Sequence, residues 1–286
     1  MKQIQSLLHS LIIVVLVSSC VNNSTSQEES TDIADNTVVA IPQGYSKIVF
    51  QDEFNDKGLV DAAKWGGYEE GYLRNGEKQY YTKGRLENCR VENGGVLYIT
   101  ALNDSALIDG AIRPVTSASI TTKGKAEWKY CRIDVRAKLP VCLGTWPAIW
   151  MMPAESSYGR WPDSGEIDIM EHVGYEPESV HYAIHMKSNN HMKGNGFTSK
   201  VFSPTPNDFH IYSIEWHEDR LEWYLDGRKR FVINKPTESN WENWPYDQPF
   251  YLILNFAFGG GWGGQKGIDM EGMPLEYVID YVRVFQ

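Results

Sequence analysis

The sequence predicts an all-β fold, a β-sandwich of two antiparallel sheets connected as a jelly roll, with one concave outer face left open as a cleft. From about residue 41 to the end, apolar and polar residues alternate with a period of two in many short segments. Gly, Pro, Asn and Asp separate these segments at short intervals. Outside the first 20 residues, no segment has the pattern of a helix of three turns.

Seven segments show the alternation clearly and are predicted as strands: residues 48–50, 96–99, 131–137, 210–216, 221–225, 230–233 and 277–285. Asp226 and Gly227 lie between the fifth and the sixth of them. This dipeptide readily adopts the positive φ angles of a two-residue hairpin loop, so a tight turn is predicted there.

Composition favours one large folded domain. The chain has 286 residues, of which 42% are hydrophobic and 13% aromatic, including 10 Trp and 16 Tyr. Such a chain can bury a sizeable core and is too apolar for extensive intrinsic disorder. The formal net charge is −10, opposite in sign to what a nucleic-acid binder needs. We therefore expect no nucleic-acid partner. The chain is expected to be a monomer.

The first 40 residues predict an export signal and a tether. An apolar run over residues 11–17 is too short to span a bilayer as a helix, and Ser18 and Ser19 lead directly into Cys20. This resembles a bacterial lipoprotein signal, in which the Cys is lipidated; an ordinary secretory signal is the alternative. The expected organisation is a signal peptide over residues 1–19, the lipidated Cys20 and a flexible tether over 20–40, and the folded domain over 41–286.

This organisation predicts a location in the bacterial cell envelope, on the cell surface or the periplasmic face, with the lipid as the sole membrane attachment.

The three remaining cysteines are Cys89, Cys131 and Cys142, an odd number without a C-x-x-C pair. One disulfide is possible among them, but burial as small apolar residues is favoured.

Three acidic residues form the main candidate for chemistry. Glu166 and Asp168 are two positions apart, so on a strand they project from the same face. Glu171 has the opposite parity, which a β-bulge near Met170 would correct. Three carboxylates on one face repel one another, so the arrangement costs stability unless a task requires it.

Retaining glycoside hydrolysis needs such a group, with one ionised carboxylate as nucleophile and a second, protonated one that assists the leaving oxygen. A central acid can hydrogen-bond to the nucleophile and shape both proton affinities. Two other interpretations stay open: solvated acids on an edge strand, and calcium binding by the same acids.

The segment G-E-I-D-I-M-E-H-V at residues 165–173 resembles the active-site strand of glycoside hydrolase family 16, in the bulged E-x-D-x-x-E form of its laminarinase-like branch. Further similar motifs span most of residues 45–286: F-x-D-E-F at 50–54, N-G-E-x-Q-Y-Y at 75–81, G-T-W-P-A-I-W at 144–150, a glycine-rich stretch at 260–264 and I-D-Y-V-R-V at 279–284. The resemblance implies a concanavalin A-like catalytic domain with Glu166 as nucleophile, Glu171 as acid/base and Asp168 as the assisting acid.

Flat aromatic rings suit the apolar face of a pyranose ring. The resemblance also implies substrate contacts from a loop before residue 78 and from His185 on the following strand. Trp262 lies between glycines, which let the backbone turn and present its ring, and Gln265 nearby could hydrogen-bond a sugar hydroxyl. The candidate substrate-binding residues are Arg74, Asn75, Glu77, Trp146, Trp150, Trp161, His185, Trp262 and Gln265. For Trp146 and Trp150 a place in the core is the alternative, and for His185 a structural role.

Some members of the family bind a structural calcium ion on the convex side. By this resemblance Glu53, Gly95 and Asp280 are the candidate ligands here, Gly95 through its main chain. No cofactor is required for catalysis, because the two-carboxylate mechanism uses no metal.

Family resemblance leaves the glycan open. The bulged motif, W-P-A-I-W and the Trp262 loop favour an endo-β-1,3-glucanase acting on laminarin-type glucan. The alternatives are an endo-β-1,4-galactosidase acting on mucin-type or keratan-type chains and a mixed-linkage β-glucanase. From a different class, a non-catalytic carbohydrate-binding lipoprotein is opposed by the intact acidic triad.

Overall fold

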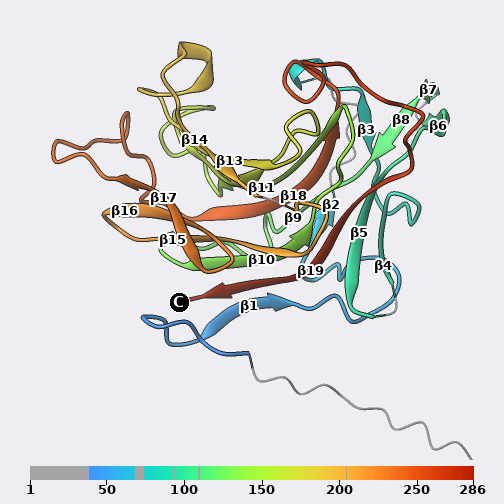
Figure 1. Ribbon diagram of the computed structural model, residues 1–286. Helices are drawn as coiled ribbons and strands as arrows, with labels where there is room; N and C mark the ends of the chain where they lie inside the picture. Colours follow the sequence, from blue (N-terminus) through green and yellow to red (C-terminus); the bar gives the residue numbers. More distant parts are fainter. Residues whose placement is uncertain (1–38, 68–73, 93, 109, 204) are drawn as a thin grey trace, which may run out of the picture. The chain divides into compact units, whose positions relative to one another are not determined.

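The computed structural model describes residues 39–67, 74–92, 94–108, 110–203 and 205–286 (Figure 1). Residues Ile41–Gln286 form one compact unit. The predicted signal peptide, Cys20 and nearly all of the tether lie outside the described residues. No helix in the described ranges is long and apolar enough to cross a membrane.

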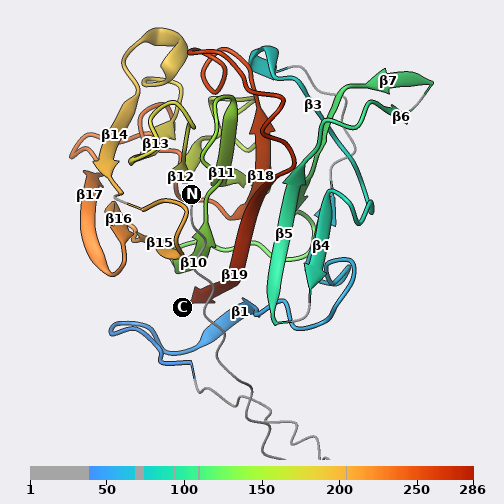
Figure 2. The same cartoon turned by 45° about the vertical axis from the view of Figure 1, so that its right-hand side comes forward.

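Within the described residues the fold is built from strands and two short 3₁₀ turns, which confirms the all-β prediction. An eight-stranded sheet has the order β17-β16-β15-β10-β19-β5-β4, with β1 paired to β19, and a seven-stranded sheet has the order β14-β13-β12-β11-β18-β9-β2. Two small sheets, β3-β8 and β6-β7, lie beside them (Figure 2). Pairing is antiparallel throughout except between β3 and β8.

The strands of the eight-stranded sheet are β1 (Ile48–Asp52), β4 (Cys89–Glu92), β5 (Val96–Ala101), β10 (Arg132–Lys138), β15 (His210–Trp216), β16 (Arg220–Leu225), β17 (Arg228–Asn234) and β19 (Leu275–Phe285). Those of the seven-stranded sheet are β2 (Gly66–Gly67), β9 (Ser119–Thr121), β11 (Thr145–Pro153), β12 (Glu166–Glu171), β13 (Ser179–His185), β14 (Phe197–Phe202) and β18 (Phe250–Phe258). The remaining elements are β3 (Gln79–Tyr81), β6 (Ala106–Ile108), β7 (Ala111–Arg113), β8 (Val115–Ser117), η1 (Arg74–Gly76) and η2 (His191–Lys193).

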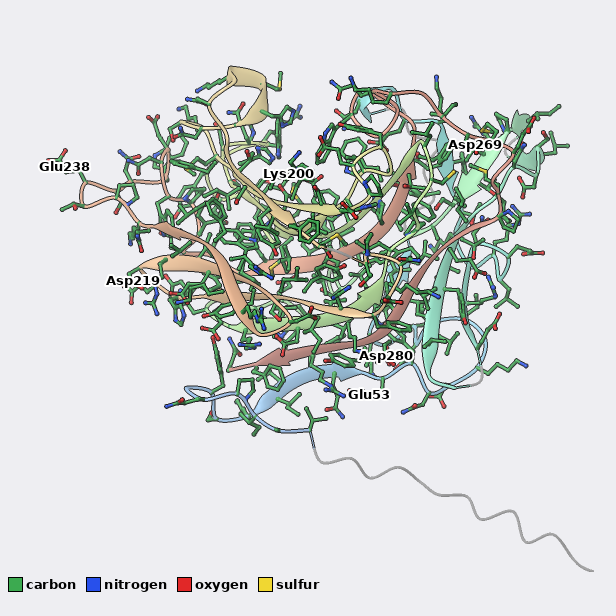
Figure 3. All side chains as sticks on the ribbon, in the orientation of Figure 1. Glu53, Lys200, Asp219, Glu238, Asp269 and Asp280 are labelled. Atoms are coloured by element: carbon green, nitrogen blue, oxygen red, sulfur yellow. The ribbon has the colours of Figure 1, made fainter. Side chains whose placement is uncertain are left out.

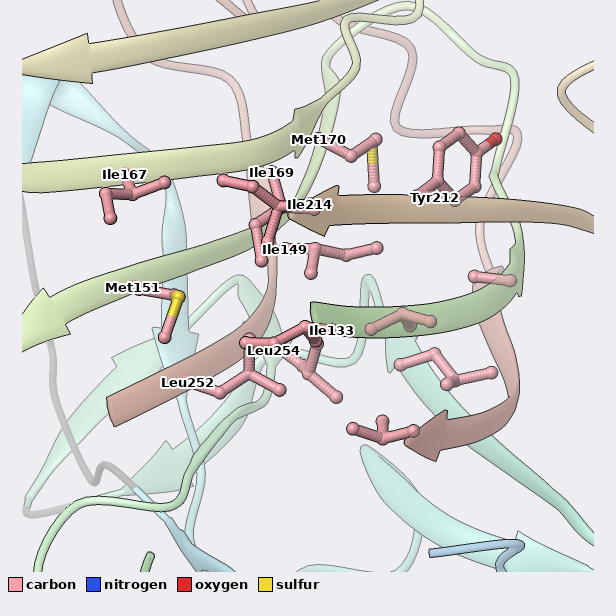
Figure 4. Packing of buried hydrophobic residues seen from close by; sticks show 14 of the residues in the cluster. Ile133, Ile149, Met151, Ile167, Ile169, Met170, Tyr212, Ile214, Leu252 and Leu254 are labelled. Carbon is pink, nitrogen blue, oxygen red and sulfur yellow. The ribbon is translucent and has the colours of Figure 1, made fainter. Parts of the chain in front are cut away.

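The core fills the space between the two large sheets. Ile133 of β10 and Ile214 of β15 come from one sheet, and Ile149 of β11 and Leu254 of β18 come from the other (Figure 4). All four side chains are fully buried. The period-two pattern arises here, because alternate side chains of each strand point into this layer.

Each of the seven predicted strands is present, with ends that differ by a few residues at most. The predicted hairpin is also confirmed: Asp226 and Gly227 join β16 to β17 with φ values of 51° and 71°. Strand β18 carries no alternation, because all nine of its residues are buried, so periodicity alone did not reveal it.

The first and last strands of the domain lie side by side. β1 pairs with β19, and the main-chain N–H groups of Ser46 and Lys47 both donate to the carbonyl of Gln286, at 2.8 and 2.9 Å.

Cys89, Cys131 and Cys142 are free thiols. Cys89 and Cys131 are buried, as predicted, whereas Cys142 is partly exposed.

Candidate active site

Strand β12 contains the predicted bulge. Met170 pairs with Ile149 and Asp168 with Trp150, two adjacent positions of β11, so Ile169 is the extra residue. Ile169 and Met170 are both fully buried and point into the core (Figure 4). Because two consecutive side chains enter the core, the acids on either side of them share the opposite face.

That face forms the floor of a cleft with a volume of about 660 Å³. The acids Glu166, Asp168 and Glu171 line it together with aromatic and polar side chains from β3, β11, β18 and the adjacent loops. The remaining lining residues are Asn75, Glu77, Tyr81, Ser119, Lys123, Trp146, Ala148, Trp150, Met152, Trp161, His191, Met192, Tyr251, Ile253, Asn255 and Ala257.

Each of the two glutamates receives a hydrogen bond from an indole N–H group. Trp161 Nε1 donates to Glu166 Oε2 at 2.6 Å, and Trp146 Nε1 donates to Glu171 Oε1 at 3.0 Å. Such donors orient a carboxylate and favour its ionised form. The two tryptophans therefore fix the positions of both carboxyl groups while their rings line the cleft.

His185 lies beside Asp168 and Glu166, two of the three acids. Its Nε2 atom is 3.3 Å from Asp168 Oδ2 and 3.7 Å from Glu166 Oε1. The ring is itself buried, and His191 packs edge-on against it with ring centroids 4.9 Å apart. His185 thus contacts the acids directly and is not one of the residues that line the open cleft.

Burial raises the pKa of all three acids. The pKa of Glu166 is raised to about 8 by burial and then by the nearby charge of Asp168, whereas His185 and the Trp161 N–H oppose the rise. Burial raises the pKa of Asp168 to about 7. The pKa of Glu171 lies well above its usual range, because of burial and then the charge of Asp168. The cleft can therefore hold a protonated carboxyl group at neutral pH, which is what a general acid requires.

Comparison with known proteins places this arrangement in a family. Residues 76–283 match the sequence profile of glycosyl hydrolases family 16. A β-glucanase of Rhodothermus marinus is 47% identical over 251 residues, which cover 84% of this chain and 85% of that protein. The chain belongs to glycosyl hydrolase family 16. Family 16 members are glycosidases that need no cofactor for catalysis, so this chain is an O-glycosyl hydrolase of the retaining type.

Two further comparisons concern the fold and the range of substrates. The crystal structure of the laminarinase from Rhodothermus marinus matches with a TM-score of 0.80 and 46% identity, over 84% of this chain and 97% of that one. A keratan-sulfate endo-1,4-β-galactosidase of Sphingobacterium multivorum is 33% identical over 258 residues, covering 90% of this chain and 58% of that protein.

Most of the predicted family 16 site residues lie together. Asn75, Glu77, Trp146, Trp150 and Trp161 line the cleft with the triad. The Glu77 carboxylate accepts hydrogen bonds from Asn75 Nδ2 at 3.2 Å and from Gln79 Nε2 at 2.7 Å. Of Arg74, only the main chain in η1 is described.

The structure does not bring Trp262 and Gln265 into the cleft lining. The Trp262 ring packs edge-on against Trp146 and His181, with centroids 5.3 and 4.9 Å away. Gln265 Oε1 accepts a hydrogen bond from the Tyr175 hydroxyl at 2.9 Å. The glycine-rich loop therefore supports the wall behind Trp146.

Sequence reasoning missed cleft residues on β18 and on the loop after β13. Trp150 Nε1 donates to Asn255 Oδ1 at 2.6 Å, and Asn255 Nδ2 donates to the Tyr81 hydroxyl at 2.9 Å. A single Asn within an otherwise apolar run is the signal that could have revealed Asn255. His191 and Met192 carry no such signal, because tertiary contacts alone bring their loop to the cleft.

Of the candidate calcium ligands, Glu53 directly follows β1 and Asp280 lies on β19 (Figure 3), and Gly95 directly precedes β5. The Glu53 carboxylate accepts two hydrogen bonds from Arg283, both at 2.8 Å, and Asp280 pairs with Arg136. A Cβ atom on Gly95 would lie 3.1 Å from the Glu53 carbonyl oxygen, so the main chains meet there. With both carboxylates held by guanidinium groups, the side chains do not fit a calcium site as they stand, and calcium binding stays a prediction.

Proposed function

We propose that the chain is a retaining endo-β-1,3-glucanase that cleaves laminarin-type glucan. The observation that carries the proposal is the bulged strand β12, which brings Glu166, Asp168 and Glu171 onto the floor of a cleft lined by three tryptophans. The similarity to the Rhodothermus marinus β-glucanase and laminarinase supports the choice of glucan.

The proposed reaction is a double displacement. Glu166, ionised and oriented by the Trp161 N–H, attacks the anomeric carbon, while protonated Glu171 gives its proton to the glycosidic oxygen. The bond between the anomeric carbon and the glycosidic oxygen breaks, so that one part of the glycan leaves as an alcohol and the other stays bound to Glu166 as an ester. A water molecule then enters. Glu171, now ionised, removes a proton from it, and the hydroxyl oxygen displaces Glu166 with net retention. Asp168 shares a proton with Glu166 and so controls when the nucleophile is charged.

The substitution Glu166→Gln tests this assignment. Because an amide cannot act as the nucleophile, we expect hydrolysis of laminarin to fall by at least about 10³-fold, while the oligosaccharide is still bound in the cleft. Turnover is measured as released reducing ends and binding by calorimetry. Unchanged turnover would remove Glu166 from the mechanism. Glu238→Gln, in an exposed loop, is the matched control and should keep full activity.

The glycan is tested separately. Laminarin, mixed-linkage barley glucan, keratan sulfate and mucin O-glycans are incubated with the wild-type chain, and the released oligosaccharides are sequenced. We expect release from laminarin. The similarity to a keratan-sulfate endo-1,4-β-galactosidase over 90% of this chain makes a galactose-containing glycan the second candidate. Release from keratan sulfate or mucin alone would favour that candidate.

We propose that the chain is a lipoprotein of the bacterial cell envelope, anchored through Cys20. The support is the short apolar run followed by Ser-Ser-Cys. In cells, Cys20→Ala should move the protein from the membrane fraction to the soluble fraction, as detected by immunoblotting. Cys142→Ser, which changes a partly exposed thiol in the folded domain, is the control and should leave the distribution unchanged. Persistent membrane association of the Cys20 variant would contradict the anchor.

A further inference from the structure

We propose that Glu166, Asp168 and His185 form a binding site for a divalent transition-metal ion of the Zn²⁺ class, and that the bound ion inhibits the enzyme. Each residue offers one ligand atom, and these atoms all lie within 4.8 Å of one another. The inhibitory consequence rests on the proposed function, whereas binding itself rests on geometry alone.

The spacing of the ligand atoms fits a tetrahedral ion. Zinc–nitrogen and zinc–oxygen bonds of about 2.0–2.2 Å place adjacent ligand atoms of a tetrahedron roughly 3.3–3.6 Å apart. His185 Nε2 lies 3.3 Å from Asp168 Oδ2 and 3.7 Å from Glu166 Oε1. Two of the three spacings are therefore at or close to those of a tetrahedral ion, and the third lies within the 4.8 Å that encloses all three ligand atoms.

Asp168 Oδ2 gives an independent reason to expect a ligand. This oxygen is buried and has no hydrogen-bond partner, and the whole residue is only 2% exposed. It faces the imidazole nitrogen of His185. A buried oxygen without a partner costs free energy, which coordination of a cation would recover.

The other two ligands are also arranged for coordination. The Trp161 N–H binds Glu166 Oε2, which leaves Oε1 directed at His185. This is the role that outer hydrogen bonds commonly have in metal sites. Nε2 is the nitrogen of the His185 ring that faces both carboxylates.

A second cluster with the same residue types shows why the cleft is the preferred site. Glu215, His217 and Glu222 also lie within range of one ion. Their carboxylates already form ion pairs at 2.6–2.7 Å with three cations: Arg132, Arg220 and Lys229. Within the described residues, Glu166 and Asp168 form no ion pair with Lys or Arg. An incoming metal ion therefore displaces no cation at the cleft.

The mixed ligand set determines the class of ion. One imidazole with two carboxylates suits Zn²⁺ and similar transition metals, whereas Ca²⁺ and Mg²⁺ prefer oxygen ligands alone. A metal ion on Glu166 Oε1 would occupy the nucleophile and its approach to the sugar. The expected effect is inhibition that excess glycan relieves.

The test is calorimetric titration of the full chain with ZnCl₂, with MgCl₂ as the hard-ion comparison. We expect one Zn²⁺ per chain and much weaker Mg²⁺ binding. Zinc affinity should fall more than about 10-fold in His185→Ala and in Asp168→Asn. It should stay unchanged in His217→Ala, the matched variant of the second cluster. Thermal unfolding checks that each variant is folded; Asp168→Asn keeps the side-chain shape and decides the matter if His185→Ala does not fold.

Absence of zinc binding in the wild type, or undiminished affinity in Asp168→Asn, would overturn the site. Loss of affinity in a folded His217→Ala would place the ion at the second cluster instead and would equally overturn it. Laminarin hydrolysis at increasing ZnCl₂ then tests inhibition. Zinc binding by a chain that does not cleave laminarin would refute the proposed function alone, whereas an active chain without zinc binding would refute this inference alone.

Discussion

At the scale of single residues, the site depends on a few polar hydrogens directed at buried carboxylates. Trp161 and Trp146 each donate one N–H group to a glutamate of the triad, in surroundings that otherwise disfavour charge. The two rings therefore have two tasks, since they also line the cleft. Replacement by phenylalanine separates these tasks, because it removes the N–H and keeps an aromatic ring.

We expect Trp161→Phe to raise the pKa of Glu166 further, because the lost N–H favoured the ionised form. In the proposed mechanism Glu166 must be ionised to attack, so the acidic limb of the kcat profile should move to higher pH by about 1 unit. Profiles of kcat against pH measure this. Trp150→Phe is the control, because the Trp150 indole donates to Asn255 instead of a carboxylate. Equal shifts in both variants, or none in Trp161→Phe, would show that the hydrogen bond does not control ionisation.

At the scale of elements, the bulge of β12 lies opposite β11 only if the segments that flank the two strands keep their positions. Gly174, three residues after β12, packs against the turn before β11. A Cβ atom there would lie 1.7 Å from the Cys142 carbonyl oxygen and 2.4 Å from Thr145 Oγ1. Only glycine allows the two chain segments to approach this closely.

The substitution Gly174→Ala should therefore force the two segments apart. We expect the midpoint of thermal unfolding to fall by about 5 °C or more, together with reduced activity, because β11 carries Trp146. Calorimetry and a laminarin assay measure the two effects. Gly66→Ala is the control, since its nearest neighbours lie at an ordinary 3.7 Å. A Gly174 variant as stable as this control would show that the close approach is not required.

The elements also show how far the sequence predicts the structure. The bulge followed from parity, because Glu171 could join the other acids on one face only if an extra residue intervened. Strand β18 has no such regularity, since one of its faces packs in the core and the other is covered within the cleft floor. The positions of Trp262 and His191 depend on ring contacts with distant residues, Trp146 and Trp161 respectively, which periodicity cannot predict.

At the scale of the whole molecule, the buried triad makes folding stability depend on pH. The carboxyl group of Glu166 has an ordinary pKa of 4.5 and a pKa of about 8 in the folded chain. The folded state therefore holds this proton more tightly than the unfolded state. Folding stability is gained fully at low pH and is lost as the pH rises from about 4.5 to about 8.

Glu166→Gln removes this dependence, because an amide stays neutral throughout. We expect the variant to unfold at a higher temperature than the wild type, with a difference that is larger at pH 8 than at pH 5. Scanning calorimetry at both values measures it. Glu238→Gln, at an exposed position, should show no difference that depends on pH. If the two variants behave alike, the buried charge does not limit stability.

The pairing of β1 with β19 has a mechanical consequence. The domain's chain enters through β1, which is hydrogen-bonded to β19 in antiparallel register, beginning at the end where Gln286 lies. A pull on the chain before Ile41 would thus break these hydrogen bonds one after another, from the Gln286 end onward. The first structure to yield would be β1 on the eight-stranded sheet. The strands under the cleft belong to the other sheet and would remain unloaded while β1 peels away.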